Sequence, residues 1–148
     1  MAQPLFSVIT ITYNAAATLP PTLRSVESQT FTNYEYIVVD GASKDNTVAL
    51  VEASPLHTRL ISEPDKGLYD AMNKGLKMAV GEYLIFLNAG DAFHTPDTLQ
   101  QVADAIGNNR PGVVYGETAI VDADRNFLMM RRLKAPEKLT WRSFKNGM

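Results

Sequence analysis

Residues 6–12 have the sequence FSVITIT, and residues 34–40 have the sequence YEYIVVD. Both stretches are mainly apolar and rich in β-branched or aromatic residues, without the strict alternation of a half-exposed strand. Strands of this kind are covered on both sides, as in a parallel sheet flanked by helices. The two stretches therefore predict an α/β protein with an open, mostly parallel sheet.

Helices are expected between the strands, because Pro20 and Pro21 suit a first helical turn and Ser43 and Asp45 are placed to cap an apolar run beginning at Thr47. Repeated alternation of strand and helix favours parallel pairing of the strands. The further expected elements are a helix ending near residue 29, a helix at 47–52, a strand at 59–62, a helix at 68–80 with Gly81 at its C-cap position, a strand at 83–87, a helix starting at 95–97 and a strand at 113–115.

The alternation stops toward the C-terminal end. Residues 118–121 and 127–130 flank a turn at 122–126, which predicts a β-hairpin. No repeat or linker marks a second domain, so the 148 residues predict a single domain, 1–148. Because the chain stops after the turn-like run at 145–147, we expect this domain to be C-terminally incomplete.

Composition excludes several classes of protein. A formal net charge of -2 provides no basic field for a phosphate backbone, so no nucleic-acid partner is expected. The chain has no cysteine, which rules out disulfides and cysteine-based chemistry and favours a cytoplasmic location. Its first residues lack the features of a signal peptide, and no stretch is long enough to span a bilayer. Membrane attachment would therefore have to come from a surface of the protein or from sequence outside these 148 residues.

Polar residues follow each expected strand, at the edge where an open parallel sheet binds its ligands. A nucleotide diphosphate needs a flat surface for its base, acceptors for its donor groups and a cation for its phosphates. The loops offer Tyr13 for stacking, Asp40 as an acceptor, Lys66 as a cation and Asp91 as a hard oxygen ligand for Mg²⁺ or Mn²⁺.

Each of these residues also has a purely structural explanation. A tyrosine can be a packed aromatic residue, an aspartate can cap a turn, and a loop lysine is usually solvated. Asp70 lies near a helix start, which favours capping over ligand contact. His94 lies three residues beyond Asp91 and is an alternative metal ligand, although a lone loop histidine is more often structural.

Four motifs occur in order along the chain: SVITITYNAAATLPPTLRSVESQT, YEYIVVDGASKDNT, EPDKGLYDAMNKGLKMAVGEY and LIFLNAGD. In these motifs the sequence resembles the family 2 glycosyltransferases of the GT-A fold, which is Rossmann-like. The resemblance implies inverting transfer of a sugar from a nucleotide-diphosphate sugar, usually a UDP-sugar, with Mn²⁺ or Mg²⁺ as cofactor. The acceptor would be a saccharide or a lipid-linked saccharide, as in cell-surface polysaccharide or glycoconjugate synthesis.

The resemblance also implies residue roles. Thr12 and Tyr13 would line the base pocket, Asp40 would hold uracil or ribose, and Asp91 would bind the metal. Together with the loop positions, the expected nucleotide-sugar-binding residues are Thr12, Tyr13, Asn14, Asp40, Gly41, Lys66 and Asp70.

The sequence departs from the family pattern in two places. Asn88 and Gly90 replace acids that many relatives carry, which is similar to a subgroup with an LN(A/S)GD motif and with Met72 in place of arginine. Relatives also continue into a segment that supplies the catalytic base. None of the acids near the chain end takes that place, so the base is expected beyond Met148.

Two other functions remain open. A non-catalytic nucleotide-sugar-binding module would keep the same pocket without the base. An interaction surface against an anionic membrane would use the basic residues near the end: Arg131, Arg132, Lys134, Lys138, Arg142 and Lys145. A dinucleotide oxidoreductase is disfavoured, because residues 13–18 (YNAAAT) contain no glycine.

Overall fold

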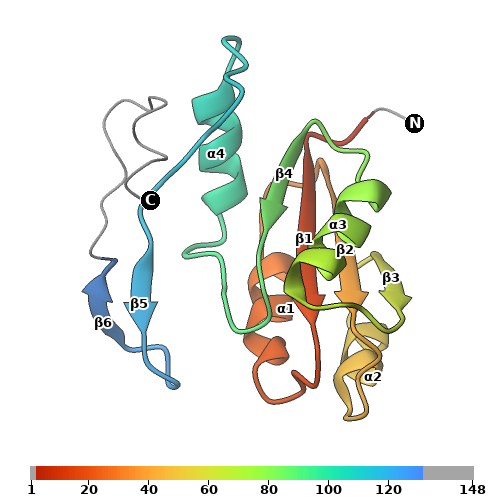
Figure 1. The fold of residues 1–148 in the computed structure, drawn as a ribbon. Coiled ribbons are helices and arrows are strands. Elements are labelled where there is room, and N and C mark those ends of the chain that lie inside the picture. Colours follow the sequence, from red (N-terminus) through yellow and green to blue (C-terminus); the bar gives the residue numbers. More distant parts are fainter. Residues whose placement is uncertain (1–2, 132–148) are drawn as a thin grey trace. The chain divides into compact units, whose positions relative to one another are not determined.

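The computed structural model describes residues 3–131, which lie in two compact units, Met1–Asp104 and Ala105–Met148. The first unit is built around a four-stranded sheet with the order β3-β2-β1-β4 (Figure 1). Its elements are β1 (Phe6–Thr12), α1 (Leu19–Glu27), β2 (Tyr34–Asp40), α2 (Thr47–Glu52), β3 (Thr58–Ser62), α3 (Leu68–Met78), β4 (Tyr83–Phe86) and α4 (Thr98–Ile106). The boundary between the two units falls within α4.

All pairings in this sheet are parallel, as the sequence predicts. The register places Thr12 beside Asp40 and Asp40 beside Ser62. The carboxyl ends of β1, β2 and β3 therefore meet at one edge of the sheet. On the other side of β1, β4 pairs with Phe6–Ile9.

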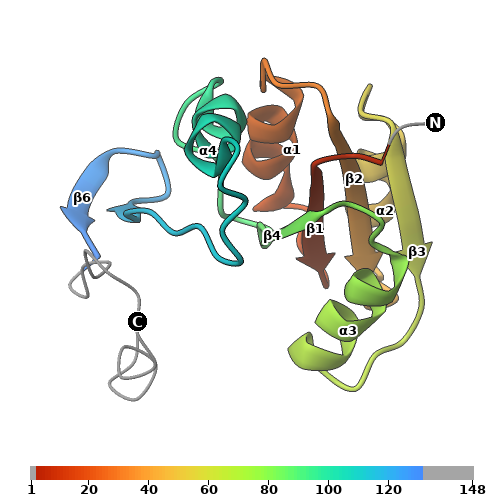
Figure 2. The same cartoon turned by 90° about the horizontal axis from the view of Figure 1, so that it is seen from above.

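Helices cover both faces of the sheet. Figure 2 shows α1 and α2 on one face and α3 on the other. All seven residues of β1 are buried, which explains why its sequence is apolar on both sides. Gly75 lets α3 approach the sheet, because a Cβ at this position would lie 2.6 Å from Cγ2 of Ile9.

The expected end of α3 is corrected. Gly81 is not the C-cap of α3, because the helix ends at Met78 and Ala79 is its C-cap residue. The N–H of Gly81 instead donates to Oγ of Ser7 at 2.8 Å, and a Cβ at Gly81 would lie 2.5 Å from the Ser7 nitrogen. The glycine is needed where two backbones touch, which a helix-end pattern does not reveal.

The start of α2 is stabilised by one of its two expected caps. Oδ1 of Asp45 accepts the N–H of Thr47 at 3.0 Å. Ser43 does not cap this helix, because its Oγ accepts the N–H of Asn14 at 2.8 Å while its hydroxyl donates to Asp40.

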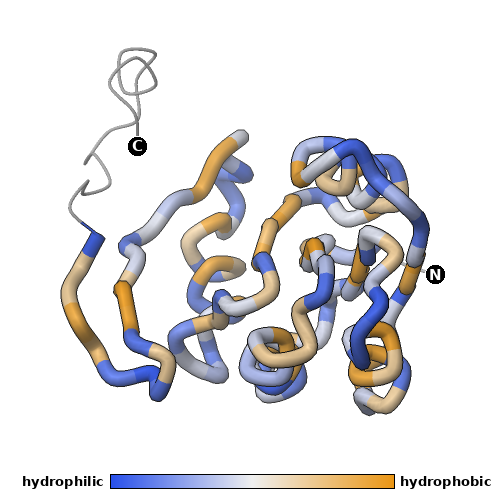
Figure 3. Tube along the Cα trace, turned by 60° about the horizontal axis from the view of Figure 1, so that its bottom comes forward, coloured by the Kyte–Doolittle hydropathy of each residue, from blue (hydrophilic) through white to orange (hydrophobic). Residues whose placement is uncertain are grey.

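The second unit contains the expected hairpin, formed by the antiparallel strands β5 (Ala119–Val121) and β6 (Phe127–Met130). Asp122 closes its turn by accepting the N–H of Asn126 at 2.8 Å. Figure 3 shows hydrophobic colouring along β6, and all four of its residues are exposed.

The expected strand at 113–115 is wrong, because these residues have no strand pairing within the described chain. Val113 and Tyr115 are exposed. An apolar run becomes a strand only when a neighbouring strand accepts its backbone hydrogen bonds, and local composition does not specify that neighbour.

Between residues 3 and 131, no helix is long and apolar enough to cross a membrane. Of the basic residues near the chain end, Arg132, Lys134, Lys138, Arg142 and Lys145 lie outside the described residues.

Candidate functional site

The loop after β1 is fastened to the loop after β2 by hydrogen bonds. Three consecutive backbone N–H groups, those of residues 14, 15 and 16, each donate to a side chain of the second loop. The acceptors are Oγ of Ser43 at 2.8 Å, Oγ1 of Thr47 at 2.8 Å and Oδ2 of Asp45 at 3.0 Å. In return, Oδ1 of Asn14 accepts the N–H of Lys44 at 2.9 Å. The two loops therefore form one rigid wall.

Asn14 supports this arrangement through its backbone, which has a φ of 46°. Asparagine tolerates this left-handed conformation better than most residues. Asn14 thus lies in the loop where the site is expected, but its side chain and its N–H both form hydrogen bonds within the protein.

Asp40, the last residue of β2, is completely buried. Its carboxylate accepts hydrogen bonds from Oγ1 of Thr12 at 3.0 Å, from the N–H of Ser43 at 2.9 Å and from Oγ of Ser62 at 2.6 Å, and a further one from Oγ of Ser43. Burial raises the pKa of this carboxyl, but the hydrogen bonds from Ser43, Ser62 and Thr12 outweigh that effect and hold the pKa below its ordinary value. Asp40 is therefore an ionised carboxylate whose hydrogen bonds join the ends of three strands.

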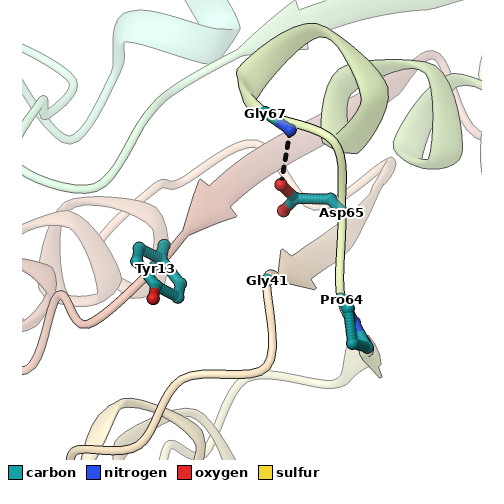
Figure 4. Close-up of a pocket in the computed structure, with 5 residues that line it drawn as sticks. All are labelled: Tyr13, Gly41, Pro64, Asp65 and Gly67. Carbon is teal, nitrogen blue, oxygen red and sulfur yellow. Dashed lines mark hydrogen bonds between the residues drawn. The ribbon is translucent and has the colours of Figure 1, made fainter.

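A pocket of about 420 Å³ opens at this edge of the sheet. Its volume lies within the range of small-molecule sites, about 300–1,000 Å³. Figure 4 shows Tyr13 on one side and the loop after β3 on the other. The residues that line it are Tyr13, Gly41, Pro64, Asp65 and Gly67.

Tyr13 and Gly41, two of the expected site residues, line this pocket. The ring of Tyr13 is available to a ligand, since the residue is 64% exposed. Asp40, which is expected to hold uracil or ribose, does not line the pocket; the lining residue is its neighbour Gly41. Thr12 is likewise buried behind the wall. The sequence identified the correct strand ends but not which side chain turns outward.

The loop after β3 contributes residues that the sequence analysis did not select: Pro64, Asp65 and Gly67. Oδ1 of Asp65 accepts the N–H of Gly67 at 2.8 Å. Gly67 has a φ of 112°, which favours glycine. Lys74 on α3 holds the loop by donating to the Pro64 carbonyl at 2.7 Å and by pairing with Glu63 at 2.9 Å. The position of this loop directly after a parallel strand was the signal that pointed to it.

Lys66 and Asp70 serve the start of α3. The backbone N–H of Lys66 donates to Oδ2 of Asp70 at 3.0 Å, and Lys66 does not line the pocket. An acidic side chain that reaches back from the first helical turn is a stabilising feature of helix starts. This geometry agrees with the capping explanation of Asp70.

The loop after β4 is fastened to α1. Oγ1 of Thr22 donates to the carbonyl of Asp91 at 2.7 Å and accepts the N–H of Gly90 at 3.0 Å. Asp91 is exposed. Oδ1 of Asn88 is buried and has no hydrogen-bond partner in the described structure.

Residues 3–131 contain no group of three or more His, Asp or Glu side chains that could enclose a metal ion. His94 and Asp91 thus do not form part of such a group. Mg²⁺ commonly binds one or two carboxylates together with substrate phosphates and water. The exposed Asp91 carboxylate fits this kind of open site, which substrate phosphates and water complete.

A parallel α/β sheet with its pocket at the carboxyl edge is the arrangement of nucleotide-binding α/β proteins. The chain belongs to glycosyl transferase family 2, whose sequence model matches residues 7–148.

Curated relatives agree with this assignment. A PGL/p-HBAD biosynthesis glycosyltransferase of Mycobacterium tuberculosis is 45% identical over 122 residues, which are 79% of this chain and 48% of the relative. The Escherichia coli enzyme WfgD, a UDP-Glc:alpha-D-GlcNAc-diphosphoundecaprenol beta-1,3-glucosyltransferase, is 32% identical over 95% of this chain and 55% of its own length. The chain therefore spans about half the length of these relatives.

Solved structures with the same fold are GT-A glycosyltransferases, as the sequence predicts. S. aureus TarS in complex with UDP-GlcNAc has a TM-score of 0.62 and 32% identity, covering 68% of this chain and 30% of TarS. Mannosyltransferase PcManGT from Pyrobaculum calidifontis, in complex with GDP-Man and Mn²⁺, has a TM-score of 0.65 and 30% identity, covering 72% of this chain and 33% of the enzyme.

Proposed function

We propose that this chain forms the donor-binding part of an inverting glycosyltransferase that transfers a sugar from a UDP-sugar to a saccharide or lipid-linked acceptor. The observation that carries the proposal is the pocket at the carboxyl edge of a family 2 sheet, lined by Tyr13 and Gly41 from two of the family-like motifs. WfgD supports the donor and acceptor classes, since its name includes UDP-Glc and a diphosphoundecaprenol-linked sugar.

UDP is the nucleotide that we propose, and TarS supports it through its complex with UDP-GlcNAc. PcManGT binds GDP-Man on the same fold, so the fold by itself does not select the base. Selection must therefore come from side chains at the pocket.

Within the site, the Tyr13 ring would stack on the base, and the fastened loops after β1 and β2 would hold its position. Stacking on a rigid, exposed aromatic ring suits a planar ligand. Gly67 leaves room for the nucleoside to approach the backbone, because no atom of the described residues other than its chain neighbours lies within 4 Å of the position that a Cβ would take. Thr12, Asn14 and Asp40 would contribute by keeping this wall in place.

Asp91, with Asn88 beside it in the LNAGD-type motif, would hold Mn²⁺ or Mg²⁺ together with the diphosphate. Such an ion stabilises the charge of the departing nucleoside diphosphate. The support for this role is the exposed Asp91 carboxylate and the Mn²⁺ complex of PcManGT.

The general base that deprotonates the acceptor would lie outside residues 1–148, as would most of the acceptor site. A positioned base typically contributes about 10² to 10⁴ in rate. We therefore expect residues 1–148 to bind UDP but to transfer little or no sugar. A lipid-linked acceptor would place the enzyme at the cytoplasmic face of a membrane, as a peripheral protein.

The proposal is tested by calorimetry of the chain with UDP in Mn²⁺, beside a donor-hydrolysis and transfer assay of the chain and of its full-length protein. Heat with UDP from the chain, and transfer only by the longer protein, is the expected result. Absence of any UDP binding would refute the donor site. Binding without turnover by the full-length protein would instead identify a non-catalytic nucleotide-sugar-binding module.

A further inference from the structure

Two aspartates follow neighbouring strands at the pocket edge, Asp40 after β2 and Asp65 after β3. A ionised carboxylate has about four positions for accepting hydrogen bonds. In Asp40 each oxygen accepts two: Oδ1 from the Thr12 and Ser43 hydroxyls, and Oδ2 from the Ser43 N–H and the Ser62 hydroxyl. Asp40 is thus buried and has no acceptor position left for a ligand.

Asp65 is in the opposite situation. Its Oδ1 accepts the N–H of Gly67, while Oδ2 accepts no hydrogen bond from residues 3–131. This second oxygen lies toward Gly41, since a Cβ at Gly41 would be 2.5 Å from it and 3.3 Å from the Tyr13 ring. The free carboxylate oxygen, the glycine and the aromatic ring therefore meet in the pocket (Figure 4).

We propose that Asp65, rather than Asp40, accepts a hydrogen bond from the bound nucleoside and thereby determines which nucleoside the pocket prefers. This inference rests on the proposed function. A carboxylate only accepts hydrogen bonds, so it selects a ligand that presents a donor beside the stacked ring. Uracil presents its N3–H and ribose presents hydroxyls, whereas N3 of cytosine is an acceptor and is repelled.

The surrounding structure keeps Asp65 in place for this role. The Lys74 ammonium holds the loop at Pro64 and Glu63, and Gly67 fixes Oδ1. Gly41 provides the space that Oδ2 occupies, so that any larger residue at position 41 would displace the carboxylate or be displaced by it. Gly41 and Asp65 are therefore coupled, although they come from different loops.

The test is calorimetry of the chain with UDP, CDP and 2′-deoxy-UDP in Mn²⁺, comparing the wild type with Asp65→Asn. The matched control is Glu52→Gln, which makes the same chemical change at an exposed end of α2. We expect Asp65→Asn to lower the affinity for UDP about 10-fold or more, as for loss of a hydrogen bond to a charged group. The control should leave UDP affinity unchanged.

The other nucleotides identify the group from which Asp65 accepts a hydrogen bond. A contact with the base predicts that Asp65→Asn narrows or reverses the preference for UDP over CDP, because an amide can donate to N3 of cytosine. A contact with ribose predicts that UDP and CDP weaken equally and that the wild type, but not the variant, discriminates against 2′-deoxy-UDP. Either result supports the proposal.

Gly41→Ala provides a second, independent test. It should also lower UDP affinity about 10-fold, by displacing the Asp65 carboxylate without changing residue 65 itself. Thermal unfolding of each variant verifies that the fold is retained. The proposal is overturned if Asp65→Asn binds all three nucleotides as the wild type does. That outcome differs from failure of the proposed function, in which the wild type itself binds none of them.

Discussion

The two ends of the pocket edge are built differently. At the ends of β1, β2 and β3, the Asp40 carboxylate is saturated by its neighbours Thr12, Ser43 and Ser62, from which it accepts four hydrogen bonds. At the end of β4, Asp91 is exposed and the Asn88 oxygen is buried without a partner. The first region is complete without a ligand, whereas the second leaves polar groups for a ligand to satisfy.

This difference indicates how binding free energy would be distributed. A pre-organised wall loses little conformational entropy when a nucleoside binds. An unsatisfied oxygen beside an exposed carboxylate gains most when a cation and phosphates arrive. Substitutions of Asp40 and its hydrogen-bond partners should therefore act on stability, and substitutions at the end of β4 on metal-dependent affinity.

The largest effect is expected from Asp40→Ala. The change leaves the buried Thr12 hydroxyl and the half-buried Ser43 donors without an acceptor, at about 1–3 kcal/mol for a group that stays unsatisfied, whereas the exposed Ser62 hydroxyl can donate to water. We expect the free energy of unfolding to fall by about 2 kcal/mol or more, measured by urea denaturation. Glu52→Ala, at an exposed position, should change it by less than about 0.5 kcal/mol. An Asp40 variant as stable as this control would show that the first region is not a structural tie.

The same carboxylate predicts a pH dependence. The folded-state pKa of Asp40 lies below its ordinary value of 3.8, so its stabilisation is fully present above that pH and is lost as pH falls through the lower folded pKa. The stability difference between the wild type and Asp40→Asn should therefore shrink as pH falls below about 3.8. Urea denaturation of both proteins between neutral and strongly acidic pH measures this. A difference that grows toward acid would contradict the sign.

Asp91→Asn sharpens the other side of the comparison. We expect UDP affinity in Mn²⁺ to fall about 10-fold, which is about 1.4 kcal/mol, while the melting temperature stays unchanged because the residue is exposed. In EDTA the wild type and the variant should bind UDP equally. Calorimetry in both buffers tests this. Wild-type UDP affinity that is the same with and without metal would remove the role of Asp91.

Asn88→Ala is expected to have only a small effect on stability. The substitution removes a buried oxygen that has no partner, so the free energy of unfolding should stay within about 1 kcal/mol of the wild type or increase. UDP affinity in Mn²⁺ should nevertheless decrease. A large loss of stability would show that Asn88 belongs to a completed network like that of Asp40.

Much of the fold is predicted by local sequence. The strands at 6–12 and 34–40 were located to the residue, because burial on both faces leaves an apolar run bounded by polar loops. The hairpin was predicted from its turn. The strand at 113–115 was not, because its existence depends on a pairing partner. The role of Gly81 was also missed, since the close approach to Ser7 joins segments 74 residues apart.

The candidate site shows the same division. The sequence by itself determined which loops lie at the carboxyl edge, because strand order along the chain and parallel pairing require the loops after β1, β2 and β3 to meet there. Only the tertiary structure decided which acid turns toward the pocket. Thr12 and Ser62, 28 and 22 residues away from Asp40, bury its carboxylate with their hydroxyls. Asp65 stays free at Oδ2 because Gly41, from another loop, has no side chain in its way.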